Sequence, residues 1–294
     1  MKKKLLALAV MTALTISTAS VYAAAPTFSG DANIEYRNSD ADGIGDNYLT
    51  NRIRLKVDSQ IDDTFYIHGR MSLVNNLRSG DGSYADSEDK VAFDRAYIGA
   101  KVDNVDVKVG RQSLAIGKGL LMDDDKFTGA QIGVDLNGAK LNTFYGKDPD
   151  AKKTQFADVT TSFDNVNVGA TYLKEADSKY YAVNADTKIT DNAVLNVEYA
   201  KNSTDKADGY LAEVVVGQNA KKGDFQYAVS YRDVEAKALP AYTTTGWYQD
   251  SKGFRIKGAY KVSDAATLTA YHDLSESQNG DDHERTNVEF AVTF

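Results

Sequence analysis

The chain has 294 residues, a formal net charge of −8 and 42% apolar residues, and it contains no cysteine. After the N-terminal segment, no run approaches the roughly 20 consecutive apolar residues of a membrane-spanning helix, which excludes a bundle of such helices. The acidic balance argues against nucleic acid as a partner, because phosphate binding requires clustered Lys and Arg. The lack of cysteine removes disulfides and thiolate metal sites.

The first residues have the features of a secretory signal. Lys2, Lys3 and Lys4 form a basic head, residues 5–16 form an apolar run, and Val21-Tyr22-Ala23 is a small-residue cleavage pattern. We therefore expect residues 1–23 to be removed on export. Residues 24–294 are then expected to form one domain.

From residue 24 on, apolar and polar residues alternate with a period of two, which is typical of β-strands with one apolar face. In residues 49–57 the odd positions are mostly apolar, and Arg52, Arg54 and Lys56 lie between them. We count sixteen such runs of about nine to twelve residues, the length of a tilted strand that crosses a bilayer. The pattern predicts an all-β chain.

The connections between these runs alternate in length. Those after even-numbered runs are short, and Asn137-Gly138 is a type I′ hairpin signal. Those after odd-numbered runs are longer and polar, most clearly residues 38–46, 75–90 and 235–250. Short turns at one end and long polar loops at the other are typical of an outer-membrane barrel, with the N-terminus on the short-turn side.

Alternation alone would also fit a soluble sandwich or solenoid. However, about sixteen hairpin-connected strands would enclose a soluble interior too wide to fill, whereas a membrane barrel of that size holds water. We predict a transmembrane antiparallel up-and-down β-barrel of sixteen strands, with fourteen as the alternative. Tyrosines near strand ends are expected to form interfacial girdles, namely Tyr36, Tyr66, Tyr145, Tyr172, Tyr199 and Tyr231.

Two segments resemble parts of bacterial outer-membrane proteins. The last run places Phe290, Val292 and the terminal Phe294 at alternate positions, which resembles the closing strand that the barrel assembly machinery recognises. Residues 94–112 are similar to the paired strands that precede the third loop of general diffusion porins. This resemblance implies a homotrimer of barrels in the bacterial outer membrane, each with its third extracellular loop folded into the pore. It further implies passive diffusion of ions and small hydrophilic solutes, without a cofactor.

Charged residues on the polar strand faces predict a constriction. A basic wall is expected from Arg52, Arg54, Lys56, Arg70, Arg95 and Lys101, with Lys108 on the next run. Arg111 shares its parity with apolar positions, and we expect a bulge at Gly110 to turn it into the lumen. Residues 115–127 form the candidate constriction loop, whose Asp123, Asp124 and Asp125 would face the basic wall. As an alternative, the arginines only keep the lumen hydrated. The alternative for the three aspartates is a turn that is solvated or binds a cation.

No arrangement of residues indicates catalysis. His68, His272 and His283 are far apart and lack a metal-ligand spacing, and there is no nucleophile elbow. We expect no enzymatic activity and no metal or cofactor, with a barrel hydrolase as the alternative from a different class. A channel specific for a sugar or an anion is a second alternative, although the expected inward aromatics, such as Tyr66 and Tyr97, are scattered.

Overall fold

The computed structural model describes residues 25–41, 44–78, 90–240 and 249–294. The predicted signal segment and parts of the three longest predicted connections lie outside these residues. In the described part, no helix is long and apolar enough to cross a membrane.

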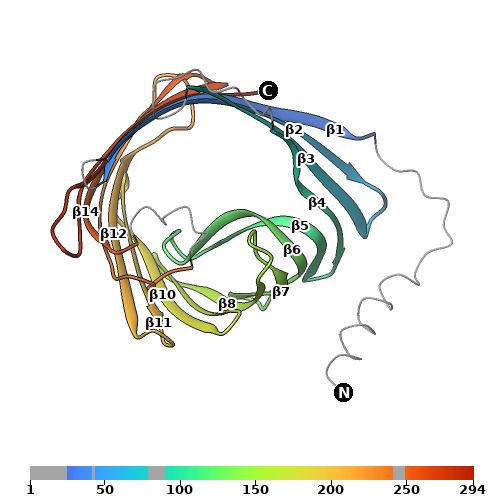
Figure 1. Cartoon of the computed structure of the whole chain (residues 1–294). Helices are drawn as coiled ribbons and strands as arrows, with labels where there is room; N and C mark the ends of the chain where they lie inside the picture. Colours follow the sequence, from blue (N-terminus) through green and yellow to red (C-terminus); the bar gives the residue numbers. More distant parts are fainter. Residues whose placement is uncertain (1–24, 42–43, 79–89, 241–248) are drawn as a thin grey trace.

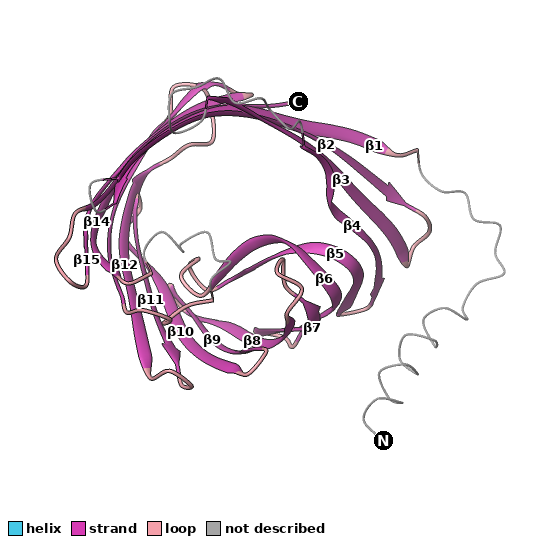
Figure 2. Cartoon of the chain, viewed as in Figure 1, coloured by secondary structure: helices cyan, strands magenta, loops and turns pink. Residues whose placement is uncertain are grey.

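Sixteen antiparallel strands make up the described chain (Figure 2). They are β1 Thr27–Ala41, β2 Ile44–Gln60, β3 Phe65–Arg78, β4 Lys90–Val102, β5 Val105–Ile116, β6 Met122–Asp135, β7 Ala139–Lys147, β8 Lys153–Phe163, β9 Val166–Glu175, β10 Ser178–Thr190, β11 Ala193–Asn202, β12 Ala207–Gly217, β13 Phe225–Val234, β14 Ser251–Ser263, β15 Ala266–Ser277 and β16 His283–Thr293. Each strand pairs with the next, and β16 pairs with β1 to close the barrel (Figure 1). The prediction of sixteen strands is confirmed, and the alternative of fourteen is wrong.

The two strand faces differ as the alternation predicts. Large apolar residues such as Ile98 and Val183 are more than half exposed on the outer surface, where lipid would contact them. Polar residues of the opposite parity face the lumen. Tyr145 lies on the outer surface, but Tyr66 faces the lumen, where its hydroxyl donates a hydrogen bond to Asp106 at 2.7 Å. The expectation that Tyr66 belongs to a girdle is therefore wrong, because it shares its strand face with Arg70.

Connection lengths follow the prediction only in part. The turn Asp103-Asn104 is short as expected, but the β9–β10 connection, Ala176-Asp177, is equally short although it follows an odd-numbered strand. Residues 38–41 and 44–46, expected in a loop, belong to β1 and β2. In the turn between β12 and β13, the backbone N–H groups of Lys221 and Ala220 bond to Asp224 and hold the pKa of its carboxyl below its usual range.

The chain end closes the barrel against β1. Phe294 and Gly30 exchange two backbone hydrogen bonds of 2.8 and 3.0 Å. The Phe294 ring lies over Gly30, where an added Cβ would come within 2.4 Å of the ring and 2.6 Å of the Arg54 carbonyl oxygen. Phe290 and the Phe294 side chain are exposed, in line with an outward apolar edge on the last strand.

Gly30→Ala is expected to weaken this closure by about 1–3 kcal/mol, because overpacking forces the ring and the β2 backbone to move. Heat-dependent unfolding of the purified barrel measures the effect. The control is Gly69→Ala on β3, where an added Cβ meets nothing within 4 Å. Equal stability of the two variants would contradict the prediction.

Candidate functional site

A hairpin made of β5 and β6 curves into the barrel (Figure 1). The pairing of β5 with β4 ends at Ala96↔Arg111, and the pairing of β6 with β7 begins at Thr128. Between these points the two strands pair only with each other. Their turn, residues 117–121, contains Gly117 and Gly119 at φ +70° and +84°, which glycine adopts without strain. The candidate constriction loop expected over residues 115–127 is thus largely a strand hairpin, with only residues 117–121 in its turn.

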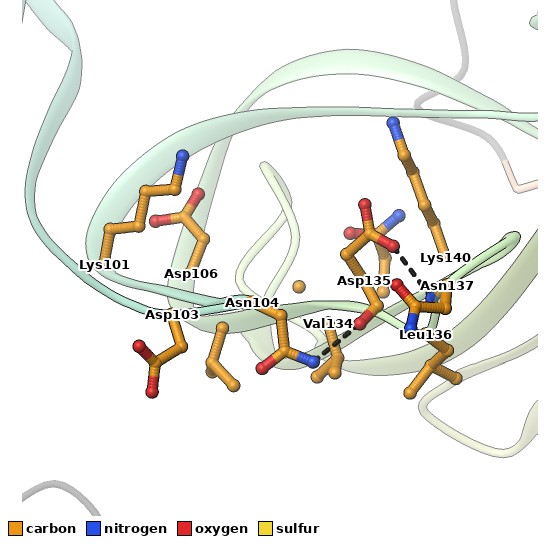
Figure 3. A pocket seen from close by; sticks show the side chains of 12 residues that line it. Lys101, Asp103, Asn104, Asp106, Val134, Asp135, Leu136, Asn137 and Lys140 are labelled. Carbon is orange, nitrogen blue, oxygen red and sulfur yellow. Dashed lines mark hydrogen bonds between the residues drawn. The ribbon is translucent and has the colours of Figure 1, made fainter.

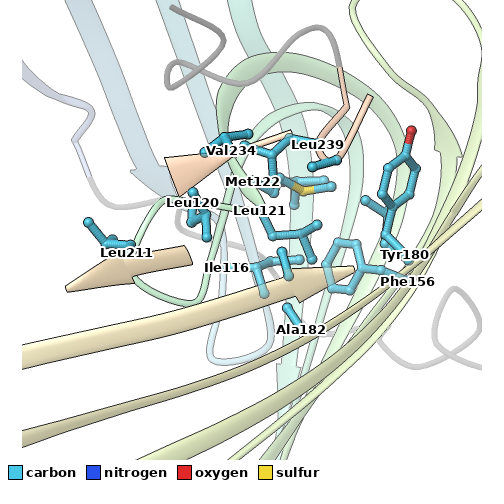
Figure 4. Close-up of a cluster of buried hydrophobic side chains, with 14 of the residues drawn as sticks. Ile116, Leu120, Leu121, Met122, Phe156, Tyr180, Ala182, Leu211, Val234 and Leu239 are labelled. Atoms are coloured by element: carbon cyan, nitrogen blue, oxygen red, sulfur yellow. The ribbon is translucent and has the colours of Figure 1, made fainter. Parts of the chain in front are cut away.

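One face of the hairpin packs on the inner wall (Figure 4). The hairpin contributes Leu114, Ile116, Leu120, Leu121, Met122 and Phe127 to a buried apolar cluster. The wall contributes inward side chains of β7 to β12, namely Phe144, Phe156, Leu173, Tyr180, Ala182, Ala200 and Leu211. The cluster also contains Ala207 at the start of β12, Val234 at the end of β13, and Ala238 and Leu239 after β13. Burial of these side chains, at roughly 25 cal/mol per Å² of apolar surface, holds the hairpin against this half of the barrel.

Polar contacts fix the hairpin tip to the same wall. The Glu198 carboxylate on β11 accepts the backbone N–H groups of Lys118, Leu120 and Leu121 at 2.7, 3.0 and 3.2 Å. The Lys118 ammonium donates to Asp186 on β10. We call these interactions the tip contact. A buried carboxylate requires several donors, and the hairpin turn supplies three.

At its base, the hairpin is tied to the neighbouring wall. Asp125 on β6 pairs with Arg70 at 2.5 Å and with Arg95 at 2.7 Å, and Arg70 makes a bidentate pair with Asp94 at 2.7 and 2.8 Å. Arg70 is only 2% exposed. Two register irregularities make this arginine–aspartate cluster possible. Asp94 is an extra residue opposite β3, and Asp125 precedes Lys126, which has a φ of +72°.

The three adjacent aspartates have different surroundings. Asp125 joins the arginine–aspartate cluster, whereas Asp124 accepts the backbone N–H of Asp125 at 2.6 Å. Asp123 is exposed and lies opposite Ala115, on the face that points away from the buried Ile116 and Met122. Only Asp123 therefore faces the open part of the lumen. No group of three or more His, Cys, Asp or Glu side chains within the described ranges could hold a metal ion.

The basic residues of β2 lie on the lumen face. Arg54 and Lys56 both pair with Asp31 on β1, at 2.6 and 3.0 Å, which leaves one uncompensated positive charge. Arg52 makes no ion pair within the described part of the chain. Lys101 lies far from the hairpin, beside the short turns, where it lines a pocket of about 850 Å³ with Asp106 and other residues (Figure 3).

Arg111 does not lie on the lumen face with the other basic residues of the predicted wall. Its register partner is Ala96, on the outer face of β4, and the register continues unshifted through Gly110. Arg111 is exposed and donates to the Phe93 carbonyl oxygen at 2.9 Å. The bulge expected at Gly110 is absent from this pairing, so the expectation of an inward Arg111 is wrong.

Sequence reasoning missed basic residues on β14 and β16, which adjoin β1 and β2 in the barrel wall. Arg255 on β14 makes a bidentate pair with Asp273 at 2.6 and 2.9 Å, and Arg285 on β16 lies 3.4 Å from the same carboxylate. Both guanidinium groups flank the ring of Tyr271, at 4.0 and 5.5 Å. Their inward parity was available from the sequence, and closure of β16 onto β1 brings them near the basic residues of β2.

Comparison with known proteins identifies relatives by family and by fold. A family model described as Gram-negative porin matches residues 7–294. No curated protein matches the chain. Among solved structures, an engineered tryptophan variant of the Rhodopseudomonas blastica porin superposes with a TM-score of 0.65 at 13% identity, covering 92% of this chain and 100% of that one. A variant of the same porin with four alanine substitutions gives a TM-score of 0.64 at the same identity and coverage. These structural matches show a shared fold.

Proposed function

Because the chain belongs to the Gram-negative porin family and is an outer-membrane channel, we propose that it lets ions and small hydrophilic solutes cross by passive diffusion. The observation that supports this most is the docked hairpin. It packs on the inner wall of β7 to β12, so its ribbon lies to one side of the barrel interior (Figure 1). A water-filled passage narrowed in this way limits the size of a solute but requires no chemical change in it.

The proposed constriction is charged and prefers anions. The open side carries Arg52, Arg54, Lys56, Arg255 and Arg285, and the neighbouring carboxylates are Asp31, Glu35, Asp273 and Glu289. Across the opening, Asp123 stands on the free face of the hairpin. Opposed charges across a narrow aqueous passage produce a transverse field that orients dipolar solutes and sorts ions. Arg70, Arg95 and Asp125 compensate one another, so in this proposal they position the hairpin and contribute little to the field.

The reversal potential in a planar bilayer tests the charged constriction. In a tenfold salt gradient, where ideal selectivity for one ion gives about 59 mV, the unmodified channel is expected to favour anions. Replacing Arg52, Arg54 and Lys56 together with glutamine should shift the potential toward cations by on the order of 10 mV, and Asp123→Asn should shift it the other way. Lys221→Gln, in an exposed turn, is the control. An unchanged potential in the triple variant would refute the charged constriction, and a silent protein would refute the channel.

The remaining parts of the proposal concern assembly. We propose that residues 1–23 direct export, that the last strand with Phe290, Val292 and Phe294 is the signal for the barrel assembly machinery, and that three barrels associate in the membrane. We also propose that the channel catalyses no reaction. Tyr66 and Tyr97 support no sugar-specific path, because they form a small lumen cluster with His68 and do not extend along the pore.

A further inference from the structure

Four lysines form a row on the outer surface of the barrel. They are Lys147 on β7, Lys153 on β8, Lys174 on β9 and Lys179 on β10, and we call them the outer lysine row. Each shares its strand face with lipid-facing residues such as Tyr145, Val159 and Val183. All four lie at the strand ends that are joined by the connections after odd-numbered strands. In outer-membrane barrels this rim faces the cell exterior.

Like charges stand directly opposite each other in this row. Lys147 is the register partner of Lys153, and Lys174 is the register partner of Lys179. Across the described ranges, none of the four forms an ion pair with a carboxylate. Like charges in directly opposed cross-strand positions destabilise a sheet. An external anion would remove that penalty.

Tyrosines place the row at the level of lipid headgroups. The outward residues Tyr145, Tyr172 and Tyr181 each lie two positions from a lysine of the row, on the side toward the middle of the bilayer. Tyr172 and Tyr181 pack at 5.3 Å between ring centroids. Aromatic belts mark the membrane interface. The lysines lie two residues, about 7 Å, further along the strands than these tyrosines, and their charges therefore reach the headgroup region.

An apolar depression lies on the same outer surface, and on β10 it begins at Val183, four residues from Lys179 toward the middle of the strand. It has a volume of about 600 Å³ and is lined by outward side chains of β9 to β13, among them Val183, Val197, Tyr199 and Tyr210. Because its outer lining is apolar, it suits an acyl chain and not a free anion. The row and the depression thus offer complementary surfaces to the two ends of a lipid.

The row is confined to one part of the circumference. On β11, Lys201 is neutralised by Asp208 at 3.0 Å. Further along the same rim the outward positions include Asp233, Glu276 and Glu284, and Lys252 is paired with Glu276. At the short-turn rim, the corresponding outward residues are apolar, for example Phe163. A basic surface whose lysines have no carboxylate partner among the described residues thus occurs at this rim of β7 to β10, where Lys153 lies over the Tyr145 ring at 5.2 Å.

We propose that the outer lysine row binds the phosphate groups of a phosphorylated lipid of the outer leaflet, with an acyl chain that runs along the barrel wall into the apolar depression. Lysine ammonium groups bind phosphate as point charges, and basic residues at a membrane surface attract anionic headgroups. The bound headgroup neutralises the opposed lysine pairs and ties one side of the barrel to its lipid. The inference is independent of what passes through the pore.

Binding of bis-phosphorylated lipid A to the full barrel in detergent, followed by native mass spectrometry, tests the proposal. The variant replaces Lys147, Lys153, Lys174 and Lys179 with glutamine. The control, with the same change in charge, replaces Lys206, Lys221, Lys222 and Lys237, which lie in exposed turns. The row variant is expected to bind at least about tenfold more weakly than the control. Unchanged conductance of both variants shows that each barrel is folded.

Two further probes separate the sources of phosphate. Dephosphorylated lipid A should bind the unmodified barrel as weakly as phosphorylated lipid A binds the row variant, and millimolar inorganic phosphate should compete poorly. Equal binding by the row variant and the control would overturn the proposal. So would tight binding of dephosphorylated lipid A, or full competition by inorganic phosphate, which would indicate a free anion. Protection of the four lysines from an amine-reactive reagent in lipid-free oligomers would assign the surface to a protein neighbour instead.

Discussion

Replacing Glu198 with leucine is expected to release the hairpin tip and widen the pore. The substitution leaves the backbone N–H groups of Lys118, Leu120 and Leu121 without their acceptor. Each buried donor left unpaired costs about 1–3 kcal/mol, so the docked position loses about 3 kcal/mol or more. The ratio of docked to undocked hairpins then falls by roughly 100-fold. Single-channel recording should show higher and noisier conductance, and liposome swelling should show faster entry of larger solutes.

The matched control is Glu213→Leu on β12. It removes another lumen carboxylate, which accepts a hydrogen bond from Asn196 at 3.2 Å and makes no hydrogen bond to the described residues of the hairpin. This variant therefore controls for the change in lumen charge. A second test leaves Glu198 in place. An added Cβ at Gly117 would lie 2.4 Å from the Glu198 carboxylate, whereas one at Gly119 meets nothing closer than 3.9 Å. Both glycines have positive φ, so alanine strains the backbone at either position. Because only the added Cβ at Gly117 would also clash with Glu198, Gly117→Ala should disturb conductance more than Gly119→Ala. Unaltered conductance in Glu198→Leu would show that the apolar cluster alone holds the hairpin.

The barrel could be predicted from the sequence because a period of two is a local property of each strand. Outward residues such as Ile98 and Val183 are apolar, and inward residues such as Arg54 are polar. A chain with sixteen strands of this pattern can form few folds other than a wide membrane barrel. Strand ends were harder to place. The strands extend beyond the bilayer into polar hairpins, as residues 38–41 and 44–46 show, and alternation fades where neither face contacts lipid.

The docked hairpin was less accessible from the sequence. Its base depends on irregular pairing at Asp94 and Asp125, and a single extra residue changes which face a side chain occupies. The expectation for Arg111 was wrong because it assumed a bulge at Gly110, where the pairing of β4 with β5 is regular. One signal was present and could have been used. On β7 to β11 the lumen parity carries apolar residues such as Phe156 and Leu173, which a water-filled lumen would not require. Those residues mark the wall on which the hairpin docks.

The arginine–aspartate cluster is expected to dominate the stability of the hairpin base. Arg70→Leu removes the cation between Asp94 and Asp125, and it leaves the Asp94 carboxylate, 5% exposed, without the partner that bonds it at 2.7 and 2.8 Å. Breaking a buried ion pair from one side costs about 3–5 kcal/mol. The variant should unfold at a markedly lower temperature than the unmodified barrel, as measured by heat-dependent mobility and circular dichroism.

The double variant Arg70→Leu/Asp94→Leu separates the value of the pair from the cost of an unpaired charge. Replacing both partners of a buried pair with apolar residues is often neutral, so the double variant should regain most of the stability that Arg70→Leu loses. Lys252→Leu, which removes one partner of an exposed pair with Glu276, should change stability by about 1 kcal/mol or less. If Arg70→Leu were as stable as Lys252→Leu, water in the lumen would be solvating Asp94. The cluster would then orient the hairpin without contributing to its stability.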